Sequence, residues 1–151
     1  MQRASFADMH CSIAQSLEII GEWWTMLILR DAFLGVRRFD EFVERLGISR
    51  NVLTNRLETL VAAGVMERRP YDDARGRYDY LLTDKGRDLF PVMTALRQWG
   101  DRWIYGPGNE PLLVEHRSCG SAITAQMTCD TCGEALDARS VRAIPGPGDP
   151  D

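Results

Sequence analysis

The amino-acid sequence predicts a mainly α-helical chain with one small β-hairpin, followed by a small β-rich module that contains cysteines. Over most of residues 12–103, apolar residues recur at spacings of three and four, which is typical of amphipathic helices. Residues 65–82 instead contain two short strand-like runs with a turn at Gly76 between them. The glycine- and proline-containing stretch 106–111 is typical of a linker and separates the helical part from the module.

Two helices are expected near the start of the chain. Ser12 and Gln15 resemble a capping box, in which two side chains three positions apart bond to backbone N–H groups at a helix start. This first helix ends at Gly21. The second helix, from Glu22 to about Phe33, is apolar nearly all round, so we expect it at the centre of the core.

A short helix, a tight turn and a longer helix follow. Phe42, Val43 and Leu46 share the inward face of the short helix, and Gly47 marks the turn. Ser49 can accept a backbone N–H and so begin the longer helix, whose buried face is marked by Val52, Leu53, Leu57, Leu60 and Val61. Two helices joined by three or four residues that include glycine are the signature of a helix-turn-helix.

The outer face of this longer helix is polar. Its first two turns carry Arg50, Asn51, Thr54 and Asn55 on the side opposite the apolar residues. Arg, Asn and Thr side chains near a helix N-terminus can reach base edges and phosphates in a DNA major groove. An ordinary solvated helix face is the alternative interpretation. The helix-turn-helix context favours DNA binding.

A β-hairpin and a last helix complete this part of the chain. Residues 65–71 and 77–82 are expected to be strands, and a hairpin directly after a recognition helix is a wing. The predicted fold is therefore a winged helix-turn-helix. Thr83 is expected to cap one long final helix, kinked at Pro91, with an apolar stripe of Leu89, Val92, Met93, Leu96, Trp99 and Trp103.

The charge of the chain is unevenly distributed. A net charge of −4 by itself argues against binding to nucleic acid. Residues 30–87, however, carry a slight excess of basic residues, and the rest of the chain is acidic. The predicted DNA-binding half is the less acidic one, although it forms no strong basic patch.

Several short motifs carry a family resemblance. In chain order they are Cys11, Gly21-Glu22-Trp23-Trp24, Gly35 with Arg38-Phe39, Ile48-Ser49, Leu53-Thr54-Asn55-Arg56-Leu57, Gly64-Val65, Tyr80-Leu81-Leu82-Thr83 and Trp99. With these motifs, the stretch from Cys11 to Trp103 resembles the HxlR-type winged helix-turn-helix transcriptional regulators of the MarR-like superfamily. The resemblance implies a homodimer, built by the first and last helices, that binds a two-fold operator in double-stranded DNA. It also implies repression, the commoner mode in the family.

Ten residues make up the predicted DNA-binding surface: Arg37, Arg38, Ser49, Arg50, Asn51, Thr54, Asn55, Arg56, Arg75 and Arg77. Arg75 and Arg77 flank the wing tip, where arginine can enter a narrow minor groove. Arg37 and Arg38 precede the helix that crosses the DNA backbone, and there they can hold phosphates. Arg56 can reach phosphate or brace the wing through an ion pair, and both interpretations stay open.

Cys11 has two interpretations. The resemblance implies a redox role, because some family members sense oxidants or electrophiles through an N-terminal cysteine. A thiol just before a helix N-terminus is also made more reactive, since the helix dipole favours the thiolate. The alternative is a small buried apolar residue.

The C-terminal module carries a candidate zinc site. The motifs His116-x-x-Cys119-Gly120 and Cys129-x-x-Cys132-Gly133 supply three thiolates and one imidazole, which suit tetrahedral zinc. Strand-like runs at 112–117, 122–128 and 136–144 suggest a zinc-ribbon-like fold. A segment this short normally needs a metal or the support of a larger domain. The alternatives are metal-free strands with a Cys129–Cys132 disulfide, or simple thiols.

These observations predict four parts: a DNA-binding and dimerisation domain at 1–105, a linker at 106–111, a cysteine-containing β module at 112–144 and a flexible tail at 145–151. The absence of a signal pattern or a long apolar run predicts a cytoplasmic protein without membrane segments. No Gly-rich phosphate loop or catalytic triad is evident, so we expect no enzyme. The competing class is a thiol–disulfide or zinc-dependent protein-interaction module that does not bind DNA.

Overall fold

The computed structural model of the protein describes residues 5–148. Residues 1–4 and the last three residues of the predicted tail lie outside this range. The chain divides into two compact units, Met1–Met93 and Thr94–Asp151, which are described separately below. Among the described residues, no helix combines the length and the apolar character needed to span a bilayer.

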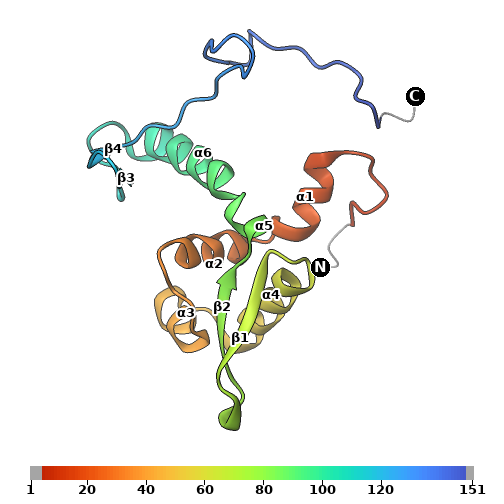
Figure 1. Ribbon diagram of the computed structural model, residues 1–151, viewed down its shortest axis with the longest axis vertical. Coiled ribbons are helices and arrows are strands. Elements are labelled where there is room, and N and C mark those ends of the chain that lie inside the picture. The colour runs from red at the N-terminus through yellow and green to blue at the C-terminus, as the bar shows by residue number, and fades with distance from the viewer. Residues whose placement is uncertain (1–4, 149–151) are drawn as a thin grey trace. The chain divides into compact units, whose positions relative to one another are not determined.

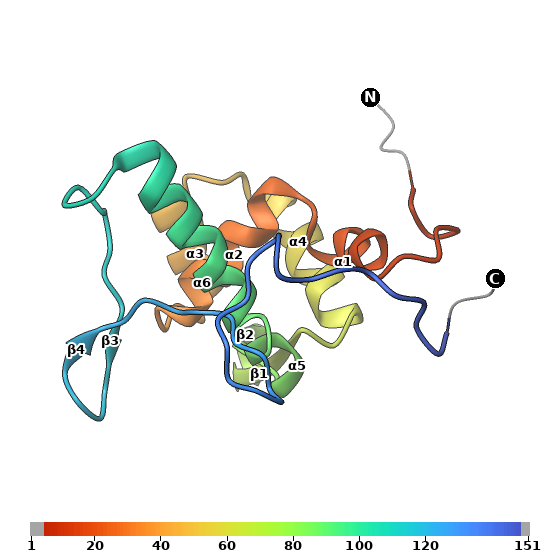
Figure 2. The ribbon, with the colours of Figure 1, turned by 90° about the horizontal axis from the view of Figure 1, so that it is seen from above.

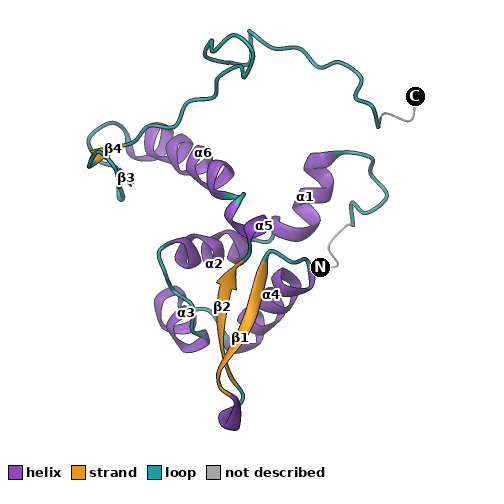
Figure 3. Ribbon diagram, viewed as in Figure 1, coloured by secondary structure: helices purple, strands orange, loops and turns teal. Residues whose placement is uncertain are grey.

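The first unit contains a helix-turn-helix followed by a β-hairpin (Figures 1 and 3). Its elements are α1 (Ser12–Ile20), α2 (Trp23–Phe33), α3 (Phe39–Leu46), α4 (Arg50–Ala62), β1 (Met66–Asp72), β2 (Arg77–Leu82) and α5 (Asp84–Arg87). Helix α6 (Phe90–Gly100) begins in the first unit and ends in the second. The second unit continues with a π-helical turn (Asp101–Tyr105) and the two-residue strands β3 (Glu115–His116) and β4 (Ser121–Ala122). The helical fold with a hairpin confirms the predicted fold class for the main part of the chain.

The core of the first unit lies where α2, α3, α4 and the start of β1 meet. Its buried residues are Ile28, Leu29, Phe42, Ile48, Leu53, Leu57, Leu60, Val65 and Met66. Each large apolar side chain buried in this way contributes about 1.5–3 kcal/mol to folding. Helix α2 contributes Ile28 and Leu29, as predicted, but its first residue, Trp23, is 90% exposed. Only part of the surface of α2 is therefore buried in the core.

One buried ion-pair cluster links α2 to α3. The carboxylate of Asp31 is fully buried, and it accepts hydrogen bonds from Arg30 Nε at 2.8 Å and from Arg45 Nε at 3.2 Å. A buried carboxylate is costly unless it is paired, so both arginines are needed to keep Asp31 in place. Because Arg45 belongs to α3, the cluster fixes the helix that precedes the turn.

Of the helix caps predicted at Ser12 and Ser49, the one at Ser49 is confirmed and the one at Ser12 is wrong. Ser49 caps α4, since its Oγ accepts the backbone N–H of Val52 at 3.4 Å. The capping box at Ser12 is wrong, because Cys11 occupies the N-cap position and makes no side-chain cap. The Gln15 amide instead donates to the carbonyls of the preceding loop, those of Phe6, Ala7 and Met9.

The prediction of one long final helix is also wrong. Thr83 does cap a helix, with its Oγ1 accepting the N–H of Gly86 at 3.1 Å, but that helix ends at Arg87. A new helix begins at Phe90. Pro91 explains the break, because it has no N–H to donate and its ring clashes with the carbonyl four residues earlier. Proline is tolerated in the first turn of a helix, and the chain starts α6 there.

The β-hairpin is confirmed, and it also pairs with the chain before α3. Strands β1 and β2 run antiparallel from the Met66–Leu82 pair to the Pro70–Tyr78 pair, and Gly76 turns the chain with φ +59°. On its other edge, β2 forms an isolated bridge between Asp79 and Arg38. The N–H of Tyr80 donates to the carbonyl of Arg37 at 2.7 Å. The wing is thus bonded directly to the segment that leads into α3.

The second unit contains much less regular structure than the sequence suggests. The strands expected at 112–117, 122–128 and 136–144 are reduced to the short pair β3–β4 and one isolated bridge, Thr128–Ala135. None of the described residues between 106 and 148 is buried. Few large apolar side chains are available there, so a sheet would have no face to bury.

Replacement of Gly86 by alanine should destabilise the fold. A methyl group at this position would overlap the backbone carbonyl oxygen of Val65 and lie 3.1 Å from Leu82 Cδ2. Overpacking of this kind costs about 1–3 kcal/mol. The control is Gly100→Ala, because a methyl group there meets no atom of the described residues within 4 Å. Urea denaturation at one fixed protein concentration measures the stability of both variants. Equal unfolding midpoints for Gly86→Ala and Gly100→Ala would contradict the packing argument.

Candidate nucleic-acid interface

A groove of about 800 Å³ lies between the starts of α3 and α4 and the wing. It brings together five of the ten predicted DNA-binding residues: Arg38, Arg50, Asn51, Thr54 and Arg77. Arg50, Asn51 and Thr54 are exposed on the first two turns of α4. Side chains at the N-terminal end of such a helix are the ones that reach base edges when the helix enters a major groove.

The other five predicted residues lie outside this groove. Arg37 lines a different hollow, Ser49 uses its hydroxyl as the α4 cap, and Asn55 is exposed farther along α4. Arg75, at the wing tip, pairs with Asp72 at 3.7 Å. Arg56 is only a quarter exposed, and its guanidinium lies 3.7 Å from Glu22. The ion pair of Arg56 is therefore made with the residue before α2, and its contact with phosphate stays a prediction.

Each arginine on the α3 side of the groove is held by a carboxylate and an aromatic ring. Arg50 donates to Asp40 at 2.8 Å and stacks over the Phe39 ring at 4.9 Å. Arg38 lies 3.7 Å from Asp79 and 4.7 Å from the centre of the Tyr71 ring. The rings order the guanidinium groups, while the carboxylates neutralise part of their charge. A DNA phosphate must therefore compete with a carboxylate for each of them.

Asp79 holds two arginines at once. Its carboxylate is 3.7 Å from both Arg37 Nε and Arg38 Nε, and it is largely buried. Within the described part of the chain, its Oδ1 accepts no hydrogen bond. Nearby, burial raises the pKa of Tyr80, an effect that Arg68 partly offsets. Tyr80 therefore adds a neutral hydroxyl to the groove and no negative charge.

Sequence reasoning missed Asp40, Asp79 and the two aromatic rings. Asp40 stands in the first turn of α3, where an acidic residue is expected simply because it favours the helix dipole. Asp79 lies in a strand and has no spacing that relates it to Arg37 and Arg38. Only the pairing of β2 with residues 37 and 38 could have pointed to it.

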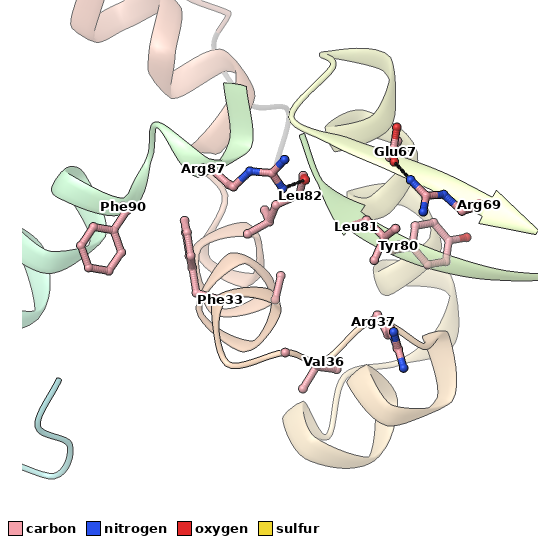
Figure 4. A pocket seen from close by; sticks show the side chains of 12 residues that line it. Phe33, Val36, Arg37, Glu67, Arg69, Tyr80, Leu81, Leu82, Arg87 and Phe90 are labelled. Carbon is pink, nitrogen blue, oxygen red and sulfur yellow. Dashed lines mark hydrogen bonds and ion pairs between the residues drawn. The ribbon is translucent and has the colours of Figure 1, made fainter. Parts of the chain in front are cut away.

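A second hollow, of about 750 Å³, lies beside the C-terminal end of α2 (Figure 4). Phe33, Val36 and Phe90 give it an apolar lining. Its cations are already engaged within the chain: Arg69 bonds to Glu67 at 2.7 Å, and Arg87 bonds to the Leu82 carbonyl at 2.6 Å. It also lacks the exposed Asn and Thr of a recognition helix, so the groove at α4 is the candidate DNA site.

Comparison with known proteins agrees with this geometry. The HxlR-like helix-turn-helix family matches residues 19–106, which is more than half of the chain. The chain belongs to this family.

Relatives of this HxlR-like protein include transcriptional regulators. Rv3095 of Mycobacterium tuberculosis, an uncharacterised HTH-type transcriptional regulator, is 44% identical over 137 residues, 91% of this chain and 87% of the relative. The crystal structure of PA1607, a candidate transcription factor, is 38% identical, covers 95% of this chain and all of PA1607, and has a TM-score of 0.84. The redox regulator HypR, in its reduced form, is 29% identical over 62% of this chain and 96% of HypR, with a TM-score of 0.57.

The C-terminal segment lies beyond the HxlR-like region. The matches with Rv3095 and PA1607 nevertheless extend past residue 106, because each covers more than nine tenths of the chain. The segment is thus shared with other proteins, although it stands outside the family's common part.

The four predicted metal ligands lie in this segment as two separate pairs. His116 Nδ1 is 3.4 Å from Cys119 Sγ, and Cys129 and Cys132 share a second turn. Among the described residues, no three metal-ligating side chains come together. Backbone N–H groups of Cys132 and Thr131 hold the pKa of the Cys129 thiol below its usual range. The backbone N–H of Ser121, together with its hydroxyl, does the same for the pKa of Cys119.

Replacement of Asp40 by asparagine should strengthen binding of this HxlR-like protein to random-sequence DNA. The change removes the carboxylate that holds Arg50 and would repel phosphate. We expect an increase of about three- to five-fold at low salt, the range of one exposed ion pair. The control is Asp84→Asn, which removes the carboxylate paired with Arg87 outside the groove. Fluorescence anisotropy with a random-sequence duplex measures the DNA affinity of both variants. An equal increase in affinity for Asp84→Asn would contradict a local effect of Asp40.

Proposed function

We propose that the protein is a homodimeric, sequence-specific DNA-binding regulator that uses α4 as its recognition helix and β1–β2 as its wing. The observation that carries the proposal is the groove in which Arg50, Asn51 and Thr54 of α4 face Arg77 of the wing. Asn can bind adenine through two hydrogen bonds, Arg can bind guanine in the same way, and Thr can contact the thymine methyl. The arginine of the wing supplies a contact to the backbone or the minor groove.

Exposed apolar side chains support a homodimer. Ile13 in α1 is 72% exposed, and Trp99 in α6 is 59% exposed. Leu96 and Trp103 are also exposed. Apolar surfaces of this kind mark sites that another protein covers. A two-fold dimer would place two copies of α4 about one DNA turn apart, which matches a two-fold operator.

We infer repression as the mode of action from the family resemblance. A dimer bound at a two-fold operator within a promoter would occupy DNA that RNA polymerase needs. Transcription from the promoter that the purified protein protects tests this inference. Higher transcription on addition of the protein would contradict it.

Replacement of Asn51 by alanine should weaken specific binding much more than non-specific binding. The loss of a base contact costs about 1–3 kcal/mol at the operator, or about 5- to 150-fold in affinity, and little elsewhere. Arg77→Ala should weaken binding to operator and random DNA alike, because arginine on the wing tracks the backbone. Arg87→Ala is the matched control, since Arg87 is an exposed arginine outside the groove.

Gel shifts with the protected promoter and with a scrambled duplex separate these outcomes. Unchanged operator affinity in Asn51→Ala would contradict α4 as the recognition helix. Absence of DNA binding by the wild-type protein would instead favour the alternative, a thiol or zinc-dependent interaction module.

Redox control through Cys11 is a second candidate function. Cys11 is exposed at the N-cap of α1, in the helix that we assign to the dimer. The buried apolar interpretation is wrong for this chain, because the side chain is accessible. The similarity to the redox regulator HypR adds support. Oxidation of Cys11 would alter a helix of the dimer and with it the spacing of the two recognition helices.

Replacement of Cys11 by serine should abolish the response of DNA binding to oxidants. Treatment of the wild-type protein with diamide or an aldehyde should change its operator affinity several-fold, whereas Cys11→Ser should keep the affinity of the reduced protein. Anisotropy titrations before and after treatment, then after added thiol, measure this. If wild type and Cys11→Ser respond alike, Cys11 has no sensing role.

A further inference from the structure

Each half of the predicted metal site is already formed as a tight turn. In the first, the N–H groups of Cys119 and Gly120 donate to the carbonyl of His116 at 3.2 and 2.8 Å, and Gly120 has φ +70°. In the second, the N–H of Gly133 donates to the carbonyl of Cys129 at 2.8 Å, and Gly133 has φ +76°. Both glycines adopt a conformation that other residues rarely take.

The ligand atoms of the first pair have the spacing of a metal site. Zn–S and Zn–N bonds of about 2.3 and 2.0–2.1 Å, at a tetrahedral angle, place sulfur and nitrogen about 3.6 Å apart. His116 Nδ1 and Cys119 Sγ are 3.4 Å apart. The second pair lies in a turn of the same kind, which the bond from the Gly133 N–H to the Cys129 carbonyl closes.

One chain does not bring the two pairs together. Among the described residues, no three potential ligands gather. The middle of the connection between the pairs is hydrogen-bonded to α6 through two bonds between Gln98 and Ala125. Gln98 Nε2 donates to the Ala125 carbonyl at 3.0 Å, and the Ala125 N–H donates to Gln98 Oε1 at 2.7 Å. After β4 the chain leads away from the β3–β4 hairpin (Figures 1 and 2).

The segment also lacks a core of its own. Leu113, Met127, Val141 and Ile144 are all more than half exposed, and no described residue from 106 to 148 is buried. A piece of chain with fixed turns, exposed apolar side chains and two incomplete ligand pairs is of the kind that a metal or a partner chain stabilises. The partner with complementary ligand pairs is a second copy of this chain.

We propose that each zinc site is shared between two protomers, with His116 and Cys119 of one and Cys129 and Cys132 of the other. The inference rests on the proposed homodimer, which would hold two such sites. Zinc would bind three thiolates and one neutral imidazole in a closed tetrahedral site, so its role is structural. The three thiol protons leave to water as the metal binds.

Two mixed dimers distinguish shared sites from sites within one chain. In the first, one full-length chain carries Cys119→Ser and the other carries Cys129→Ser. In the second, one chain carries both substitutions and the other is wild type. Two different affinity tags on co-expressed chains isolate each mixed dimer. After zinc loading and removal of the excess, native mass spectrometry gives its composition and plasma emission gives its zinc content.

Shared sites predict two zinc ions in the wild-type dimer, one in the first mixed dimer and none in the second. Sites within one chain predict none in the first and one in the second, and this result would overturn the proposal. Cys11→Ser is the control and should keep both ions. A wild-type dimer without zinc, or with a Cys129–Cys132 disulfide, would overturn the metal site and leave DNA binding intact. A wild-type monomer would overturn both the shared site and the proposed dimer.

Discussion

The wing is joined to the helix-turn-helix through one short backbone pairing, and the geometry of the groove depends on it. The N–H of Tyr80 donates to the carbonyl of Arg37, and Asp79 pairs with Arg38 directly before α3 begins. Since α3 packs on α4, and α4 packs on β1, this pairing closes a loop of contacts around the groove. The distance between the wing and the start of α4 is thereby fixed before any DNA is bound, which limits the ordering cost of binding.

Acidic groups lie next to the basic ones around the groove. Asp79 lies between Arg37 and Arg38, and Asp40 holds Arg50. In a chain with a net charge of −4, these contacts keep the general attraction to phosphate low. Specific binding would then have to come from base contacts and, in the proposed dimer, from two recognition helices acting together. A weakly charged surface is compatible with a regulator whose selectivity depends on the operator sequence.

Local signals in the sequence predicted most of the first unit. The cap at Ser49, the turn at Gly76 and the apolar spacing of α4 each depend on neighbouring residues, and each is found in the structure. Five of the ten proposed contacts line the groove, and each was predicted from its place in a local element: before α3, on α4 or on the wing. The Asp40 and Asp79 pairs depend on how elements pack against each other, and no spacing along the chain reports that. Pro91 predicts a disturbance of the final helix, but the sequence alone does not show that the helix breaks there instead of bending.

The C-terminal segment shows most clearly which features depend on neighbouring residues and which depend on contacts between distant parts of the chain. Its two glycine turns follow directly from the motifs around Cys119 and Cys129, and both are present. The predicted strands are mostly absent, because a strand needs a partner and a face to bury, and the segment alone provides neither. Two pairs of potential ligands that lie apart within one chain are compatible with the proposed site shared between protomers. In the proposed dimer, metal binding would link the two chains by a contact that does not involve the apolar faces of α1 and α6. The supply of zinc and the redox state of the thiolates that bind it would then both affect whether the two recognition helices stay paired.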